Sequence, residues 1–246
     1  MEHRTKIMTR IATVAGLALS VAPVNAAVII MSVTSGPNNP STPTDELAYV
    51  SDVSSTDLLH GITGITSGTA FAGGDAANLN DGLHGINDST PPLPLGDAVA
   101  EVAWTADSGT SREFVIGDGA YGLGYDISGI QSIASWSVAG FMNQKYNIFL
   151  RSLGGSYGLY ATVDYQPALA VGEGGATKVN VTDNTGLLGS GIDAIRFDFL
   201  DTVSNDVGGA AYREIDVFGV ATVPEPSSTV LLSLGGLAIA LRRRRA

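Results

Sequence analysis

The sequence has no cysteine and few positive charges. Without cysteine there are no disulfides, thiolate metal sites or cysteine nucleophiles. Seven of the 13 Lys and Arg residues lie in the two tails; setting them aside, with Glu2 and Glu225, leaves six against 22 Asp and Glu, a net charge of −16. So acidic a chain repels phosphate backbones, which excludes nucleic acid, whereas divalent cations and neutral sugars remain compatible partners.

Helical periodicity is also lacking between the tails, where short alternating segments bounded by Gly, Asp, Asn or Pro dominate. In one of them Ile195, Phe197 and Phe199 share a face. The alternating segments are residues 113–116, 130–138, 146–151, 159–165, 177–181, 192–199 and 213–220. With one or two further strands in the looser section 35–94, this pattern predicts an all-β fold, an antiparallel β-sandwich or jelly roll.

The N-terminus has the three parts of a secretory signal. A basic stretch precedes an apolar core over residues 11–22, and Val24-Asn25-Ala26 is a small-residue cleavage site. We therefore expect residues 1–26 to form a signal helix that signal peptidase cuts between Ala26 and Ala27. A permanent anchor is the alternative, but the apolar run is well short of the ~20 residues that span a bilayer.

The C-terminus also has three features in order. Pro224, Glu225 and Pro226 are followed by an apolar stretch over residues 229–241, expected as a short hydrophobic helix, and by four arginines at 242–245. The prolines keep the peptide extended, the apolar stretch partitions into the membrane, and the arginines hold the end in the cytoplasm. An ordinary anchor is the alternative, and here too the apolar run is short for a full span.

This tail, from Val223 to Arg245, resembles the PEP-CTERM sorting signal. The resemblance implies processing by an exosortase in a Gram-negative bacterium that makes exopolysaccharide. It also implies a final place in the cell envelope, on the cell surface or in the extracellular matrix, with membrane contact only through this segment before processing. The expected division is a signal peptide (1–26), a β-sandwich domain (27–222) and a sorting signal (223–246).

The middle domain resembles the discoidin, or galactose-binding-like, jelly-roll family. An Asp81-Gly82 loop lies upstream of Trp104, and the domain closes on residues 212–219, which read YREIDVFG. The resemblance implies one structural calcium ion held by the Asp81 and Glu214 side chains and a carbonyl near Asn78. The family's Thr-x-Trp after the Asp-Gly is missing, so a plain turn at Asp81-Gly82 is the competing interpretation.

Glycan contact would require exposed aromatic rings, and Tyr121 and Tyr157 both lie in Gly-rich loops. The glycine pattern at residues 117–122 is rejected as a dinucleotide site because no helix can follow it. The pattern at 154–158 is a hairpin turn. His60 and His84, interpreted as loop or surface residues, show no catalytic spacing.

These observations favour a non-enzymatic, exported module that binds exopolysaccharide or another glycan. A purely structural surface or biofilm protein without a small ligand is the second hypothesis. A polysaccharide hydrolase is the third, and it would need a cleft with two convergent carboxylates.

Overall fold

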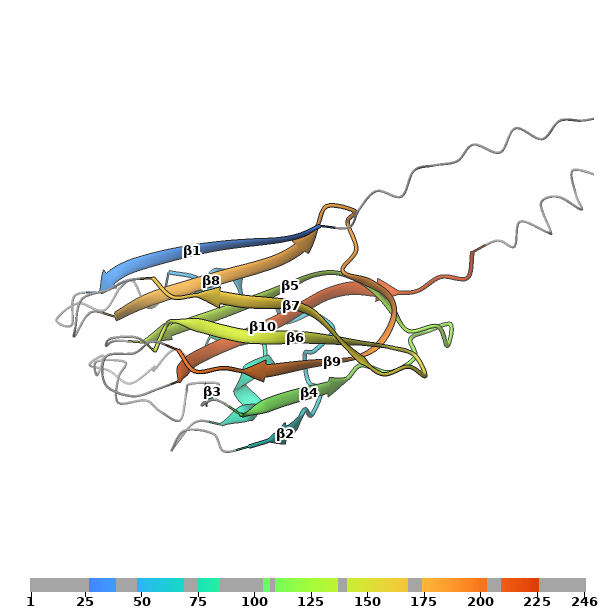
Figure 1. The fold of residues 1–246 in the computed structure, drawn as a ribbon, viewed down its shortest axis with the longest axis horizontal. Coiled ribbons are helices and arrows are strands. Elements are labelled where there is room, and N and C mark those ends of the chain that lie inside the picture. Colours follow the sequence, from blue (N-terminus) through green and yellow to red (C-terminus); the bar gives the residue numbers. More distant parts are fainter. Residues whose placement is uncertain are drawn as a thin grey trace, which may run out of the picture.

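The computed structural model describes residues 27–38, 48–68, 75–84, 104–106, 109–136, 141–167, 174–202 and 209–225. Within them ten strands form one antiparallel system with two short 3-10 helices, which confirms the predicted all-β class (Figure 1). No helix in these ranges is long and apolar enough to cross a membrane. The expected signal helix and C-terminal hydrophobic helix lie outside the described residues.

The strands divide into two sets, each with its own hydrogen-bonded order. The first runs β3-β10-β5-β8-β1 and the second β7-β6-β9-β4-β2. A short pairing of β5 with β9, at Tyr125↔Ile192 and Ile127↔Gly189, links them at one end. The first set comprises β1 (Val28–Asn38), β3 (Trp104–Ala106), β5 (Tyr125–Trp136), β8 (Gly174–Asp183) and β10 (Ala210–Ala221). The second comprises β2 (Ile65–Ser67), β4 (Ser111–Val115), β6 (Gln144–Ser152), β7 (Tyr157–Tyr165) and β9 (Gly189–Phe199).

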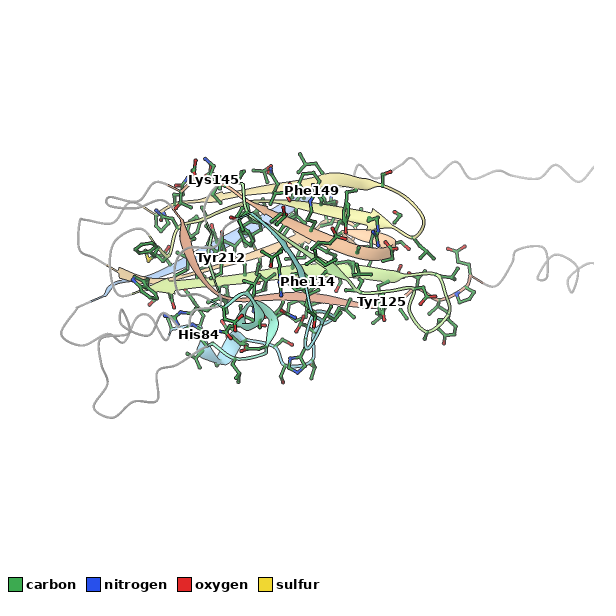
Figure 2. All side chains as sticks on the ribbon, turned by 90° about the horizontal axis from the view of Figure 1, so that it is seen from below. His84, Phe114, Tyr125, Lys145, Phe149 and Tyr212 are labelled. Carbon is green, nitrogen blue, oxygen red and sulfur yellow. The ribbon has the colours of Figure 1, made fainter. Side chains whose placement is uncertain are left out.

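The core lies between these two sets. Tyr146 of β6 meets Phe197 of β9 and Tyr212 of β10 with ring centroids 5.9 and 6.0 Å apart, both edge-on. The Tyr146 hydroxyl also hydrogen-bonds the Ser132 hydroxyl of β5 at 2.7 Å. Figure 2 shows Phe114 and Tyr212 inside the molecule. The apolar residues of the alternating segments therefore form the inward faces of the two sheets of a sandwich.

Each of the seven predicted strands overlaps a strand of the structure, over 113–115 in β4, 130–136 in β5, 146–151 in β6, 159–165 in β7, 177–181 in β8, 192–199 in β9 and 213–220 in β10. Ile116 follows β4, and residues 137–138 lie outside the described part of the chain. The section 35–94 contributes β2 and the end of β1, in line with the one or two strands expected there. β1 as a whole and β3 were not predicted.

Residues 48–62 and 75–84, here together termed the covering segment, lie over the outer face of β10. They contain the 3-10 helices η2 (Val50–Asp52) and η3 (Ala76–Asn80), and Leu59 and Leu79 are buried among them. The Leu58 amide donates to the Val217 carbonyl at 2.8 Å. The Asn80 side-chain amide donates to the Leu59 carbonyl, which ties the two parts of the segment together. β10 is consequently buried on both faces from residue 210 to 217, and its polar residues there are enclosed.

Candidate functional site

The outer face of β10 carries four side chains in succession: Glu214, Asp216, Phe218 and Val220. Residues two apart in a strand share a face, roughly 7 Å apart. Glu214 and Asp216 are fully buried beneath the covering segment, whereas Phe218 and Val220 are 37% and 66% exposed. One strand face thus holds a buried acidic cluster and, next to it, an open apolar surface.

The acidic cluster consists of Asp57, Glu214 and Asp216. One carboxylate oxygen of each lies within 4.8 Å of those of the other two. Asp57 comes from the covering segment, where its Oδ1 accepts from the Leu59 amide at 2.7 Å and from the Val217 amide at 3.2 Å. The Leu59 bond closes a local turn within the covering segment, and the Val217 bond ties that turn to β10, which brings a third carboxylate to the pair on the strand.

Further donors fix the other two carboxylates. Asp216 accepts from the Gln131 side-chain amide at 2.8 Å and from the Ser54 amide at 3.3 Å. Glu214 Oε1 accepts from the Gly82 amide at 3.3 Å. The cluster therefore joins the last strand to residues 54–57 and to the Asp81-Gly82 loop.

Three carboxylates this close cannot all be ionised at neutral pH without compensation. Burial, with the nearby Asp216 charge, raises the pKa of Glu214 to about 10. Burial, with Asp57, raises the pKa of Asp216 to about 7, and burial also raises the pKa of Asp57. The metal-free cluster thus retains protons that a bound cation would displace.

Two oxygens of the cluster are buried without a hydrogen-bond donor among the described residues: Glu214 Oε2 and Asp57 Oδ2. Buried acceptors in proteins are nearly always satisfied. Hard oxygen ligands gathered at this spacing suit a hard divalent cation such as calcium, which takes six to eight oxygens. The residues present therefore fit a calcium ion, with Glu214, Asp57 and Asp216 as carboxylate donors.

The ligands expected from the sequence lie around this cluster. Glu214 is at its centre. Asp81 is close enough to raise the pKa of Glu214, but its Oδ1 accepts from the Leu83 amide at 2.8 Å in a local turn. Asn78 is half-buried in η3, where its amide donates to the Asp75 carbonyl. The sequence reasoning missed Asp57 and Asp216.

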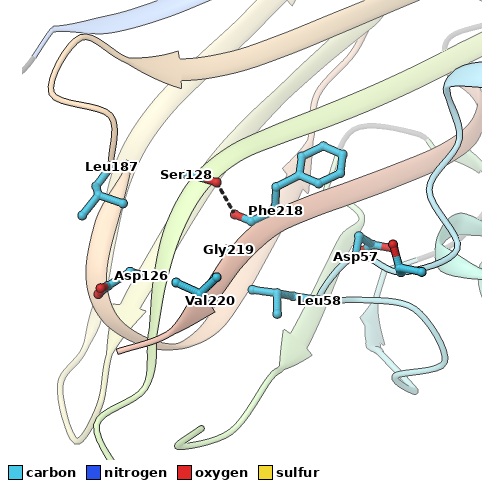
Figure 3. A pocket seen from close by; sticks show the side chains of 9 residues that line it. Asp57, Leu58, Asp126, Ser128, Leu187, Phe218, Gly219 and Val220 are labelled. Atoms are coloured by element: carbon cyan, nitrogen blue, oxygen red, sulfur yellow. Dashed lines mark hydrogen bonds between the residues drawn. The ribbon is translucent and has the colours of Figure 1, made fainter. Parts of the chain in front are cut away.

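Beyond the cluster a groove of about 360 Å³ follows the exposed end of β10 (Figure 3). Phe218, Val220 and Leu187 supply its apolar surface, and Thr56, Asp57, Asp126 and Ser128 its polar groups. The Ser128 hydroxyl donates to the Phe218 carbonyl at 3.2 Å, which joins β5 to β10 beneath the groove. Asp126 and Asp57 stand at opposite ends of it (Figure 3).

Neither tyrosine predicted to contact glycan lines this groove. Tyr121 is 57% exposed in the loop between β4 and β5. Tyr157 is half-buried at the start of β7, where the guanidinium groups of Arg151 and Arg196 lie 5.3 and 5.0 Å from its ring centroid. The two tyrosines therefore belong to different surfaces from Phe218, which the sequence reasoning did not single out.

His84 lies in a loop, as interpreted, but it is not at the surface. Its side chain is only 4% exposed, and burial together with Arg213 lowers its pKa to about 3. The ring is therefore neutral at physiological pH. His60 is exposed, as expected.

The two predicted processing sites are described in part. The Ala27 amide donates to Asn184 Oδ1 at 2.9 Å, while Ala26 lies outside the described residues. Pro224 and Glu225 are exposed immediately after β10, and Pro226 lies outside. The sorting motif thus leaves the sandwich directly from its last strand.

Comparison with known proteins agrees on the tail. Residues 222–245 match the PEP-CTERM protein-sorting motif. None of the curated proteins matches the chain. The chain is therefore an antiparallel β-sandwich followed by a PEP-CTERM motif, which implies export and surface sorting in Gram-negative bacteria.

Similar solved structures are carbohydrate-binding modules. The family 32 module of Clostridium perfringens NanJ, in complex with galactose, is 16% identical with a TM-score of 0.40, over 63% of this chain and 92% of that chain. Chitosan-binding module 1 from a Paenibacillus chitosanase/glucanase is 15% identical with a TM-score of 0.36, over 66% and 98%. CpGH89CBM32-4 of Clostridium perfringens, in complex with GlcNAc-α-1,4-galactose, is 14% identical with a TM-score of 0.38, over 65% and 92%.

Proposed function

We propose that this protein is a non-enzymatic surface or matrix protein, sorted by an exosortase, whose β-sandwich binds glycan in the groove along β10. The observation that carries the proposal is an exposed aromatic ring, Phe218, in a groove of about 360 Å³ with carboxylate and hydroxyl groups around it. One apolar face with a few convergent polar groups is the usual composition of a small-ligand site.

The chemistry of the groove suits a neutral pyranose. The apolar face of a sugar ring stacks on Phe218, with Val220 and Leu187 extending the apolar surface. Ser128 and Thr56 offer hydroxyl groups that both donate and accept. Asp126 is an ionised acceptor, because its bonds from the Ser190 and Thr222 hydroxyls lower its pKa. The strongly acidic domain disfavours anionic sugars.

We favour non-catalytic binding as the function of this groove. A glycosidase needs two carboxyl groups about 5 to 9.5 Å apart across the scissile bond. Asp57 accepts a hydrogen bond from the Val217 amide, and Asp126 lies opposite Val220 where β5 pairs with β10. Val217 and Val220 are three residues apart along β10, or about 10 Å, and any sideways offset increases the separation of the two carboxyl groups. Asp57 is moreover directed at Glu214 and Asp216 rather than at Asp126.

Calcium enters the proposal as a structural ion. Asp57, Glu214 and Asp216 would supply carboxylate oxygens, with the Asp81 side chain and a carbonyl near Asn78 as further donors from the adjoining loop. When bound, the ion neutralises the cluster and fixes residues 54–57 against β10. Because Asp57 and Leu58 also line the groove, the ion would hold one wall of the glycan site in place.

The test is a binding titration with the full chain and neutral galactose- or hexosamine-terminated oligosaccharides. Phe218→Ala should weaken binding about tenfold, because a stacked ring contributes about 1.4 kcal/mol. Leu159→Ala on the other sheet, also an exposed apolar residue, is the control and should bind normally. Tyr121→Ala and Tyr157→Ala show whether either tyrosine contributes. If no glycan binds with or without calcium, the glycan-binding proposal is wrong, and the hypothesis of a purely structural surface protein is retained.

A further inference from the structure

We propose that the end of the sandwich from which both chain ends leave rests on the lipid bilayer surface while the C-terminal segment is inserted. This inference does not depend on glycan binding. It rests on where the chain enters and leaves the sandwich, on the exposed apolar side chains gathered there, and on the charge around them.

The chain enters the sandwich at this end. The Ala27 amide donates to Asn184 in the turn between β8 and β9, and the Asn184 amide donates back to the Ala27 carbonyl at 3.2 Å. β1 then runs away from that turn, paired with β8 from Val28↔Asp183 onward. The apolar core of the signal peptide ends at Ala22, only five residues before Ala27.

The chain leaves from the same end. The Thr222 amide donates to the Gly124 carbonyl at 2.9 Å, and the Thr222 hydroxyl donates to Asp126 at 2.7 Å. The Gly191 amide, from the start of β9, donates to the Thr222 hydroxyl at 3.2 Å. These bonds fix Thr222, at the start of the sorting motif, against β5, β9 and the loop that precedes β5. Figure 1 shows β1 beginning and β10 ending on the same side of the molecule.

The bilayer is within short reach of this exit. The apolar segment begins at Thr229, six residues after Val223, and six extended residues span at most about 20 Å. A domain of this size cannot turn over on so short a connection. The exit end must therefore face the membrane in which the segment is held.

The same end exposes a set of large apolar side chains, here termed the apolar collar: Tyr121, Leu123, Leu153, Leu187 and Val223. They come from four separate parts of the chain. The Leu153 amide donates to the Gly191 carbonyl at 2.8 Å, the Leu188 amide donates to the Ile127 carbonyl at 2.7 Å, and Gly124 lies directly against Gly191. Loops distant in sequence thus converge around the exit.

Aliphatic and tyrosine side chains at this position match the bilayer interface in character. Asp118, Asp126 and Asp183 lie around the collar, and the nearby Arg151 is ion-paired with Asp193 at 2.8 Å, so the charge there is negative overall and anionic headgroups would not be attracted. We therefore commit to neutral lipid, contacted through apolar burial, as the occupant of the collar.

Because the chain has no cysteine, single labelling sites are simple to introduce. The full chain carrying an environment-sensitive fluorophore at Leu123→Cys or Leu153→Cys is reconstituted into phosphatidylcholine and phosphatidylethanolamine vesicles with headgroup-proximal spin-labelled lipid. The matched control is Leu83→Cys, an exposed leucine beside the Gly82 contact with Glu214. Glu214 is seven residues from the end of β10, or about 24 Å along the strand.

The expected result is quenching at residues 123 and 153 several-fold stronger than at residue 83. Adding phosphatidylglycerol should leave that ratio unchanged or lower it. Equal quenching at all three sites overturns the proposal. Absence of quenching at residues 123 and 153 overturns it too, whether the collar is then exposed to solvent or covered by a second copy of the chain. Quenching that requires anionic lipid overturns it as well, because contact would then be electrostatic.

Discussion

Glu214 shows how one residue can depend on parts of the chain far from it in sequence. It is fully buried, with two other carboxylates within 4.8 Å, and among the described residues its Oε1 alone receives a hydrogen bond, from the Gly82 amide. Such a group is stable in the folded protein either protonated or beside a cation. We therefore expect the cluster to make folding depend on pH and on the calcium ion proposed above.

The pH dependence of the metal-free protein follows from the raised pKa values. A carboxyl with a folded pKa above its unfolded value stabilises the fold at low pH, and that contribution is lost as pH rises through the folded pKa. For Asp216 and Glu214 these values are about 7 and about 10. We expect the free energy of unfolding in EDTA to decrease as pH rises from about 4 to 10, measured by urea unfolding.

Calcium should reverse this loss. At pH 8, calcium at 100 times its Kd adds about 2.7 kcal/mol, which for a domain of this size raises the Tm by roughly 5–10 °C. Glu214→Gln should remove the calcium response and flatten the pH dependence, because the amide is neutral at every pH. Glu113→Gln, a partly exposed glutamate on β4, is the matched control. An unchanged calcium response in Glu214→Gln would contradict this account of the cluster.

At the scale of elements, the loops at the exit end fit closely around one glycine. Gly124 has φ +80°, and a Cβ there would lie 2.5 Å from the Gly191 carbonyl carbon. Gly122, in the same loop, has φ +67° and open space around it. Substituting these two glycines by alanine therefore distinguishes the cost of backbone strain, which both positions share, from the cost of steric conflict, which arises at Gly124.

Alanine at either glycine costs about 1–2 kcal/mol for the left-handed conformation. At Gly124 the collision with Gly191 adds about 1–3 kcal/mol. Chemical unfolding should therefore show Gly124→Ala to be clearly less stable than Gly122→Ala. Equal losses would mean that the β4–β5 loop does not lie against the start of β9.

Seven strands could be predicted because each directs alternate apolar side chains into the core between the two sheets, which is visible in its own residues. The burial of β5 and β10 on their outer faces as well was not visible in that alternation. β1 could not be predicted, since Val28–Asn38 opens on a continuous apolar run next to the expected cleavage site, without alternation. β3 has only three residues. The covering of β10 by residues 48–62 and 75–84 depends on tertiary contacts, which no local pattern records.

The candidate site also contains residues that could be predicted from the sequence and residues that could not. The Asp81-Gly82 loop and Glu214 were predicted from a family resemblance, and Gly82 and Glu214 are in contact. Asp216 could have been found, because it is two residues from Glu214 and so shares its strand face. Asp57 could not, since it reaches the cluster only through the fold of a loop 157 residues earlier than Glu214 in the sequence.

At the scale of the whole molecule, the arrangement has three functional parts. The acidic cluster is enclosed beneath the covering segment, the groove opens along the end of β10, and the apolar collar surrounds the exit of the sorting motif. The groove and the collar meet at Leu187, so membrane contact at the collar would place the Leu187 end of the groove beside the bilayer and leave the Phe218 end further from it.

Whether glycan binds in the groove along β10 is best measured by an NMR titration of the full chain with a neutral oligosaccharide. We expect the largest shift changes on the amides of Ser128, Phe218, Gly219 and Val220, and we expect Phe218→Ala to raise the oligosaccharide concentration at the titration midpoint about tenfold. Changes confined to the β7-β6-β9-β4-β2 face, or to the loop of Tyr121, would contradict it.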